Sequence, residues 1–294
     1  MMCAQTSESG IEYADPEDQH LVLDLAAPEG DGPFPAVVCI HGGGFREGDR
    51  TYFNATCEKL AQHGYVAVTI EYRLAPKYPF PAAVEDCKAA VRWLRANAEK
   101  YHIDPKRIGA TGASAGGTLA LFLGTTGDEK KYEGDGGNAD ESSRVQCVVS
   151  HFGAADFTKS YGKSVDAADV LPLYLGGNLE EARAKHVEAS PLTWVTKDDA
   201  PTLCLHGVND KYVAVEQSEF IVGKLKKAGV EAKLVKYDGA GHGFEGDVYE
   251  KADEEMIRFF DAHLKKGSAR ARGEGVNAVV RGILWLWRRG GNGE

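Results

Sequence analysis

The sequence predicts an α/β fold, in which helices flank a mainly parallel central sheet. From Pro35 onward, short apolar runs alternate with stretches whose apolar residues recur at about the 3.6-residue period of a helix. Several of the runs are apolar throughout, as expected for parallel strands that are buried on both faces. The length of 294 residues, with 43% hydrophobic and 27% charged residues, suits one large globular domain with a well-buried core.

The predicted strands follow one another along the chain. Two early runs, Ile11 to Tyr13 and His20 to Leu25, are expected to add antiparallel strands at an edge of the sheet. The parallel part of the sheet is expected to consist of six further runs: Ala36 to Ile40, Tyr65 to Glu71, Arg107 to Thr111, Val145 to His151, Thr202 to His206 and Ala232 to Tyr237.

Helices are predicted between these strands. The stretch 80–98 places Val84, Cys87, Val91 and Leu94 on one stripe, with charged residues on the opposite face, which is typical of an amphipathic crossover helix. The stretch 213–229 is expected to join the last two strands, and 249–264 to close the domain.

We predict a single domain over residues 1–266, with a cap-like insertion at about 152–196. The region from Gly127 to Thr196 departs from the strand–helix alternation, and its last forty or so residues contain no clear strand. The tail 267–294 carries two tryptophans in an apolar run too short to span a bilayer. For this tail a docked helix or a translated vector or frameshift remnant is favoured over a membrane-surface helix or a homodimer contact.

The composition restricts the partners of the protein. A formal net charge of −10 argues against nucleic acid and favours a small-molecule partner. The six cysteines include no C-x-x-C pair, and Cys39, Cys147 and Cys204 fall in apolar runs, so we interpret them as reduced core residues. No H-E-x-x-H motif is present, and neither a metal nor an organic cofactor is expected. The amino terminus lacks a basic, apolar leader, so a cytoplasmic location is expected unless a leader was trimmed.

The segment G-A-S-A-G-G, residues 112–117, allows three interpretations. A phosphate-binding P-loop would need a lysine where Thr118 stands, and the spacing of a dinucleotide fingerprint is absent. The second interpretation is a plain glycine-rich turn, and the third is a turn that carries a catalytic nucleophile. The pattern G-x-S-x-G between a strand and a helix matches Gly112, Ser114 and Gly116, and it is typical of a sharp turn that exposes a nucleophilic serine.

A second glycine-rich segment, H-G-G-G-F, follows the strand that ends at Ile40. Consecutive glycines let the backbone approach a substrate closely, with amides directed at a developing oxyanion. Gly43, Gly44 and Ala115 are the predicted donors, each worth about 3–4 kcal/mol of transition-state stabilisation. Phe45 is expected to line the substrate pocket.

An acid and a base follow further along the chain. Asp210 lies just beyond one predicted strand, and His242 lies among glycines after the last one. A serine needs a base with a pKa near 7, and that base needs a carboxylate to fix its tautomer. His41 and His206 are interpreted as structural, and Asn209 and Asp238 are weaker alternatives to Asp210.

With these motifs, residues 10–265 resemble the α/β-hydrolase superfamily, in particular its hormone-sensitive-lipase-like and feruloyl-esterase-like carboxylesterases (the BD-FAE type). The resemblance includes H-G-G-G-F, Y-R-L-A-P, G-A-S-A-G-G, H-G-V-N-D-K-Y-V and G-A-G-H-G-F, with Ser114, Asp210 and His242 in the order Ser, Asp, His. It implies a serine carboxylesterase that forms an acyl-enzyme on short-chain acyl or aromatic esters of the feruloyl or acetyl type.

The chain also departs from parts of this family. Ala113 stands before the serine where many hormone-sensitive-lipase-like members have Asp, and N-D-K-Y-V replaces a D-P-L type motif. The N-D-K-Y-V motif is similar to the feruloyl-esterase-like branch and to the peptidase-related hydrolases, and the loop G-D-G-G-N-A-D-E-S-S-R-V-Q is similar to the feruloyl-esterase-like branch. Two alternatives are a non-catalytic, ligand-binding protein of the same fold and a serine peptidase related to prolyl oligopeptidase. The first usually lacks a triad residue, and the second usually carries a large additional domain.

Overall fold

A computed structural model describes residues 5–265, which form an eight-stranded sheet in the order β1-β2-β4-β3-β5-β6-β7-β8. The predicted tail 267–294 and Cys3 lie outside the described residues. The strands are β1 (Gln5–Ala14), β2 (Leu21–Pro28), β3 (Phe34–Ile40), β4 (Val66–Ile70), β5 (Ile103–Ala113), β6 (Cys147–His151), β7 (Thr202–Gly207) and β8 (Ala232–Tyr237). The α-helices are α1 (Asn54–Gln62), α2 (Ala82–Ala96), α3 (Ala115–Thr125), α4 (Ala167–Leu175), α5 (Arg183–Glu188), α6 (Glu216–Lys227) and α7 (Gly246–Leu264).

The strand directions confirm the predicted fold class. β1 pairs antiparallel with β2, and β2 pairs antiparallel with β4, so the two early runs do form an antiparallel edge. From β4 to β8 every neighbouring pair is parallel. The carboxyl ends of the parallel strands therefore meet at one edge of the sheet, where their loops can combine into a single site.

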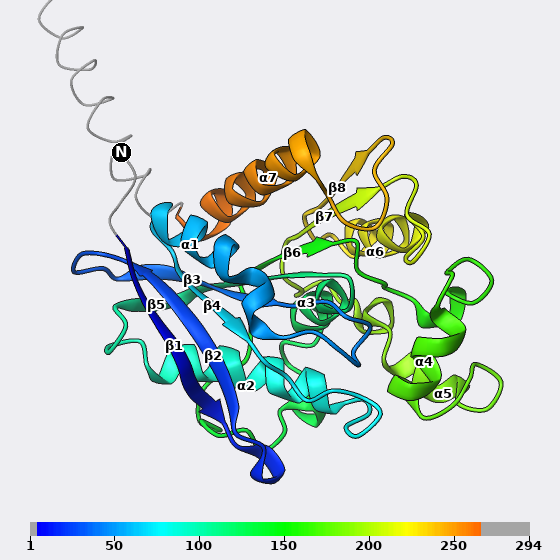
Figure 1. Cartoon of the computed structure of the whole chain (residues 1–294), viewed down its shortest axis with the longest axis horizontal. Helices are drawn as coiled ribbons and strands as arrows, with labels where there is room; N and C mark the ends of the chain where they lie inside the picture. Colours follow the sequence, from blue (N-terminus) through cyan, green and yellow to red (C-terminus); the bar gives the residue numbers. More distant parts are fainter. Residues whose placement is uncertain (1–4, 266–294) are drawn as a thin grey trace, which may run out of the picture.

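Helices cover both faces of the sheet (Figure 1). Alternate residues of β3 point to opposite faces, since Val37 and Cys39 pack in the core beneath α1 and α7, whereas Val38 and Ile40 pack in the core beneath α2, α3 and α6. All four side chains are fully buried. A strand buried on both faces explains why the sequence shows apolar runs instead of alternation.

The interpretation of the cysteines is confirmed for the five that the structure describes. Each of Cys39, Cys57, Cys87, Cys147 and Cys204 is buried and free of a disulfide.

Helix α2 differs from its sequence-based prediction, because its charged face is buried as well as its apolar stripe. Lys88 donates hydrogen bonds to the Thr126 carbonyl at 2.7 Å and to Glu133 at 3.0 Å, and Arg92 donates to Glu133 at 2.6 Å. Both cations are almost inaccessible to solvent. The polar segment 127–146 covers this face and supplies partners for the charges, which the sequence pattern did not indicate.

Segment 152–196, predicted as an insertion, contains α4, α5 and the 3-10 helices η4 (Phe157–Lys159) and η5 (Pro191–Trp194), and it contributes no strand to the sheet. Helices α4 and α5 lie together at one end of the molecule (Figure 1). Within residues 5–265, none of the helices combines the length and the apolar character that crossing a membrane requires.

Candidate active site

Ser114 occupies a strained turn between β5 and α3. Its φ of 56° lies in the left-handed region, which side chains other than glycine seldom adopt, and its amide donates to the His151 carbonyl at 2.9 Å. A Cβ on Gly112 would lie 2.3 Å from the Gly116 carbonyl oxygen, and a Cβ on Gly116 would lie 2.0 Å from that of Ile40. Only glycine fits at these two positions, so the G-x-S-x-G pattern follows directly from the tight packing of the turn.

Three predicted side chains meet at the carboxyl edge of the sheet. The Nε2 atom of His242 lies 2.9 Å from the Oγ of Ser114, and its Nδ1 atom lies 2.7 Å from the Oδ2 of Asp210. The Asp210 side chain is fully buried, whereas that of His242 is partly open to solvent. With a proton on Nδ1 donated to the carboxylate, Nε2 is free to accept the proton of the serine hydroxyl.

The carboxylate of Asp210 is held from both sides. Its Oδ1 accepts the amides of Tyr212 and Val213 at 2.8 and 2.9 Å, and His206 Nε2 lies 3.3 Å from Oδ2. Burial alone would raise the pKa of Asp210, but hydrogen bonds from His206, His242 and Val213 outweigh it and hold that pKa well below its ordinary value. The group is therefore ionised at neutral pH and can stabilise an imidazolium on His242.

The weaker alternatives do not reach the imidazole. Asn209 and Asp238 are both exposed, and among the described residues neither makes a hydrogen bond or ion pair with His242. His41 stacks on Tyr72 with ring centroids 4.2 Å apart, so its structural interpretation agrees with its position.

His206, interpreted from the sequence as structural, has two roles. Its ring bonds Ser218 and the Val213 carbonyl at 2.7 and 2.8 Å, and it also contacts Asp210. The spacing H-x-x-x-D was the available signal for this contact.

Gly43 and Gly44, on the loop after β3, border the same cleft as Ser114. Gly43 and Gly44 have φ values of 109° and 59°, and a Cβ on Gly43 would lie 2.0 Å from the Glu47 carbonyl oxygen. In the part of the chain that the structure describes, no hydrogen bond uses the N–H of Gly43 or Gly44. Ala115 begins α3, where amides have no partner within the helix. The three predicted donors therefore have N–H groups available beside Ser114.

A pocket of about 620 Å³, counting its open mouth, adjoins Ser114 and His242. Its apolar wall contains Phe45, Phe157, Val170 and Leu171, and the last three belong to segment 152–196. Phe45 is buried, and its ring stacks on Tyr174 with centroids 3.9 Å apart. Phe45 thus lies in the pocket wall, and its role in substrate binding stays a prediction, while the residues of segment 152–196 could not be named from the sequence.

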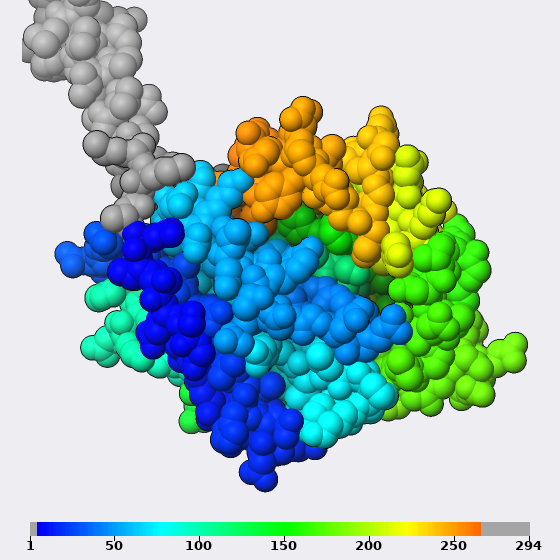
Figure 2. Space-filling model, viewed as in Figure 1, coloured from blue at the N-terminus to red at the C-terminus, as the bar shows by residue number. Residues whose placement is uncertain are grey.

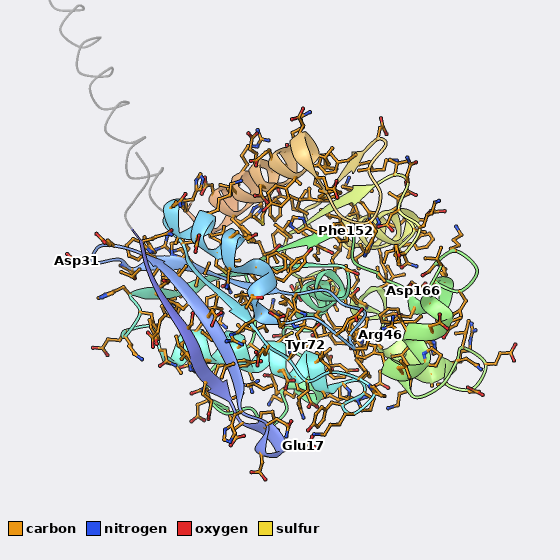
Figure 3. The ribbon with its side chains drawn as sticks, in the orientation of Figure 1. Glu17, Asp31, Arg46, Tyr72, Phe152 and Asp166 are labelled. Atoms are coloured by element: carbon orange, nitrogen blue, oxygen red, sulfur yellow. The ribbon has the colours of Figure 1, made fainter. Side chains whose placement is uncertain are left out.

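A wider cleft of about 840 Å³ also adjoins Ser114 and His242. Arg46, Phe152 and Asp166 come from three different loops to line it, and all three lie toward the same part of the molecule (Figure 3). The ring of Phe152 packs edge-on against His242 at a centroid distance of 4.7 Å. Phe152 has a φ of 43°, which no sequence pattern indicates.

Few of the described side chains are grouped closely enough to bind a metal ion together. Over residues 5–265, the group of three side chains close enough to share an ion is Glu12, Asp15 and His20, and all three are exposed. The expectation that the protein needs no metal or cofactor stays a prediction.

The fold and the arrangement of Ser114, His242 and Asp210 define a protein of the α/β-hydrolase class. The BD-FAE family model matches residues 23–225, and the chain therefore belongs to that family.

The chain is similar to known esterases. Esterase LipC of Mycobacterium tuberculosis is 31% identical over 220 residues, which is 72% of this chain and 54% of LipC. A solved truncated form of a carbohydrate esterase from gut microbiota has a TM-score of 0.78 and 28% identity, covering 90% of this chain and 98% of that one. The propionate-bound Est2 esterase of Thermogutta terrifontis has a TM-score of 0.72 and 28% identity, covering 86% and 93%. The chain spans about half the length of the curated relatives it matches first.

Proposed function

We propose that the protein is a serine carboxylesterase that hydrolyses short-chain acyl or aromatic esters. The observation that carries this proposal is the continuous hydrogen-bonded chain from Ser114 through His242 to Asp210, with distances of 2.9 and 2.7 Å. Membership of the BD-FAE family and similarity to proteins named as esterases support the same activity.

The first half of the reaction forms an acyl-enzyme. His242 Nε2 accepts the hydroxyl proton as Ser114 Oγ attacks the ester carbonyl carbon, and Asp210 stabilises the resulting imidazolium. The carbonyl oxygen becomes an oxyanion that accepts hydrogen bonds from the amides of Gly43, Gly44 and Ala115. The imidazolium then donates its proton to the alcohol oxygen, the carbon–oxygen bond breaks, and the alcohol leaves.

Water completes the cycle. His242 Nε2 accepts a proton from a water molecule that attacks the acyl carbonyl, and the same three amides bind the second oxyanion. The tetrahedral intermediate collapses as the proton moves from His242 to Ser114 Oγ, which releases the carboxylic acid and restores the enzyme.

The pocket beside Ser114 supports a preference for small acyl groups. Phe45 and Phe157 line it and meet edge-on at a centroid distance of 6.0 Å, and Tyr174 supports both rings, stacking on Phe45 at 3.9 Å and meeting Phe157 edge-on at 6.3 Å. Rigid aromatic walls of this kind admit a short chain more readily than a long flexible one. A structural neighbour determined with propionate bound is consistent with this size limit.

The experiment that tests the proposal is hydrolysis of p-nitrophenyl acetate, butyrate and octanoate, methyl ferulate, and the anilide acetyl-p-nitroanilide. We expect turnover of the two short esters, at least tenfold lower kcat/KM for octanoate, and no anilide cleavage. The rate for methyl ferulate decides between aliphatic and aromatic preference. Anilide cleavage would favour the peptidase alternative, and complete inertness toward all five would leave the non-catalytic binding protein.

A further inference from the structure

A separate pocket of about 590 Å³ lies between α1 and α7. Phe53 and Thr56 bound it on the side of α1, and Tyr249 and Met256 bound it on the side of α7. The hollow is visible between the light-blue segment around α1 and the orange helix α7, with the green region of β6 at its floor (Figure 2). His151, the last residue of β6, lines this floor.

The imidazole of His151 has no hydrogen-bond partner. It is 8% exposed, and its Nε2 atom is buried without a partner among the described residues. Two other buried imidazoles are satisfied at both nitrogens, His206 by Ser218 and Val213 and His186 by Tyr161 and Ala182, and the buried His41 is bonded at Nδ1 to the Gly42 carbonyl. Nδ1 of the same ring is not sealed in this way and also lacks a hydrogen-bond partner among the described residues, so it is the nitrogen that a ligand in the pocket can reach.

The charge state of the site favours a neutral ligand. Burial lowers the pKa of His151 to about 4, so the ring is neutral at pH 7, with one N–H donor and one lone pair. Asp253, the carboxylate in the wall, is already paired with Lys59 at 2.7 Å. A neutral hydroxyl, which can either donate or accept, complements the imidazole.

The remaining walls favour an aromatic ring. Tyr52, Phe53, Phe152, Phe244 and Tyr249 all line the pocket. Phe152 and Phe244 already meet edge-on at 5.2 Å, and they leave ring faces and edges for a further flat group.

From the unpartnered imidazole and the aromatic walls, we propose that this pocket is a binding site for a small neutral phenol, whose hydroxyl group hydrogen-bonds to His151. The site is distinct from the pocket beside Ser114. It shares Tyr52, Ala113 and Phe152 with the wider cleft, and the ring of Phe152 contacts His242. The proposal concerns binding and does not depend on ester hydrolysis.

Fluorine NMR titration of the full chain tests the proposal with 4-fluorophenol and 4-fluorotoluene, which differ only in hydroxyl against methyl. We expect saturable binding of 4-fluorophenol, at least tenfold tighter than 4-fluorotoluene, because only the phenol can satisfy the imidazole. In His151→Phe, which keeps the shape and removes the polar atoms, the two affinities should become equal. Val170→Phe, which narrows the pocket beside Ser114, should keep the wild-type preference.

The proposal would be overturned by no saturable binding to the wild type, by equal wild-type affinities for the two compounds, or by a preference that survives in His151→Phe. Loss of the preference in Val170→Phe alone would place the phenol beside Ser114 and would overturn it as well. Equal affinities of the wild type for the two compounds would refute the proposal even if a variant fails to fold.

Discussion

Replacing Asp210 by asparagine should abolish most catalysis while leaving the fold intact. The two oxygens of Asp210 have different partners, since Oδ1 accepts the amides of Tyr212 and Val213 and Oδ2 faces His242 Nδ1. In Asp210→Asn the side-chain oxygen must stay with the two backbone donors, which turns the NH₂ group toward His242. Nδ1 then has to accept a hydrogen bond, so the proton moves to Nε2 and the ring can no longer accept the proton of Ser114.

The size of the loss follows from this change of tautomer. The same substitution in a serine-protease triad lowers kcat by about 10⁴, and at about 1.36 kcal/mol per tenfold this is about 5.4 kcal/mol of transition-state stabilisation. We expect a loss of that order in kcat, with KM changed by less than about threefold, because Asp210 does not line the pocket beside Ser114.

The assay is steady-state hydrolysis of p-nitrophenyl butyrate. Asp238→Asn is the matched control, since Asp238 is exposed on the loop that carries His242 and should keep wild-type kcat. If Asp210→Asn retained more than a tenth of wild-type kcat, the tautomer argument and the assignment of Asp210 would both be wrong.

Three further predictions concern stability. Gly116→Ala should prevent folding of the turn, because its Cβ would lie 2.0 Å from a carbonyl oxygen of β3. Gly223→Ala, with no atom within 4 Å of its Cβ, should instead stabilise α6 by up to about 1 kcal/mol. Soluble yield and urea unfolding would show the contrast, and a stable Gly116→Ala variant would contradict the packing argument. Lys88→Met should cost about 1–3 kcal/mol and expose segment 127–146 to limited proteolysis, since it removes one of the two buried cations that pair with Glu133 and leaves the Thr126 carbonyl without its donor. Unchanged unfolding and proteolysis would refute this. Burial lowers the pKa of His151 from 6.5 to about 4, so between those pH values the unfolded chain binds a proton that the folded chain does not, and stability is lost as pH falls. The free energy of unfolding of His151→Phe, measured in urea titrations, should therefore fall by about 2 kcal/mol less than that of wild type between pH 7 and pH 5. Equal losses would contradict the lowered pKa.

The sheet was predictable because its strands are buried on both faces and therefore stand out as apolar runs. The turn around Ser114 was predictable for a related reason. A Cβ at Gly112 or Gly116 would lie less than 2.5 Å from a backbone carbonyl oxygen, so both positions require glycine. Short-range packing constraints of this kind leave local patterns that can be read without the structure.

Features that depend on distant partners could not be predicted. The buried cations of α2 resemble an exposed helix face in sequence, because Glu133, their common partner, lies some forty residues away. Helix α1 has only a short apolar stripe and was not predicted. His151 and Phe152 acquire their surroundings from α1, α7 and the loop of His242, elements that come together only in three dimensions.

The most direct test of the central claim is the kcat/KM of Ser114→Ala for p-nitrophenyl acetate, measured beside wild type and Ser160→Ala. Ser160 lines the same pocket and makes no hydrogen bond to His242 through its side chain in the described residues, so its variant should keep wild-type activity. We predict that Ser114→Ala loses activity by a factor of about 10⁶, the loss found when a triad nucleophile is removed. Activity in Ser114→Ala within tenfold of wild type would contradict the assignment of Ser114 as the nucleophile.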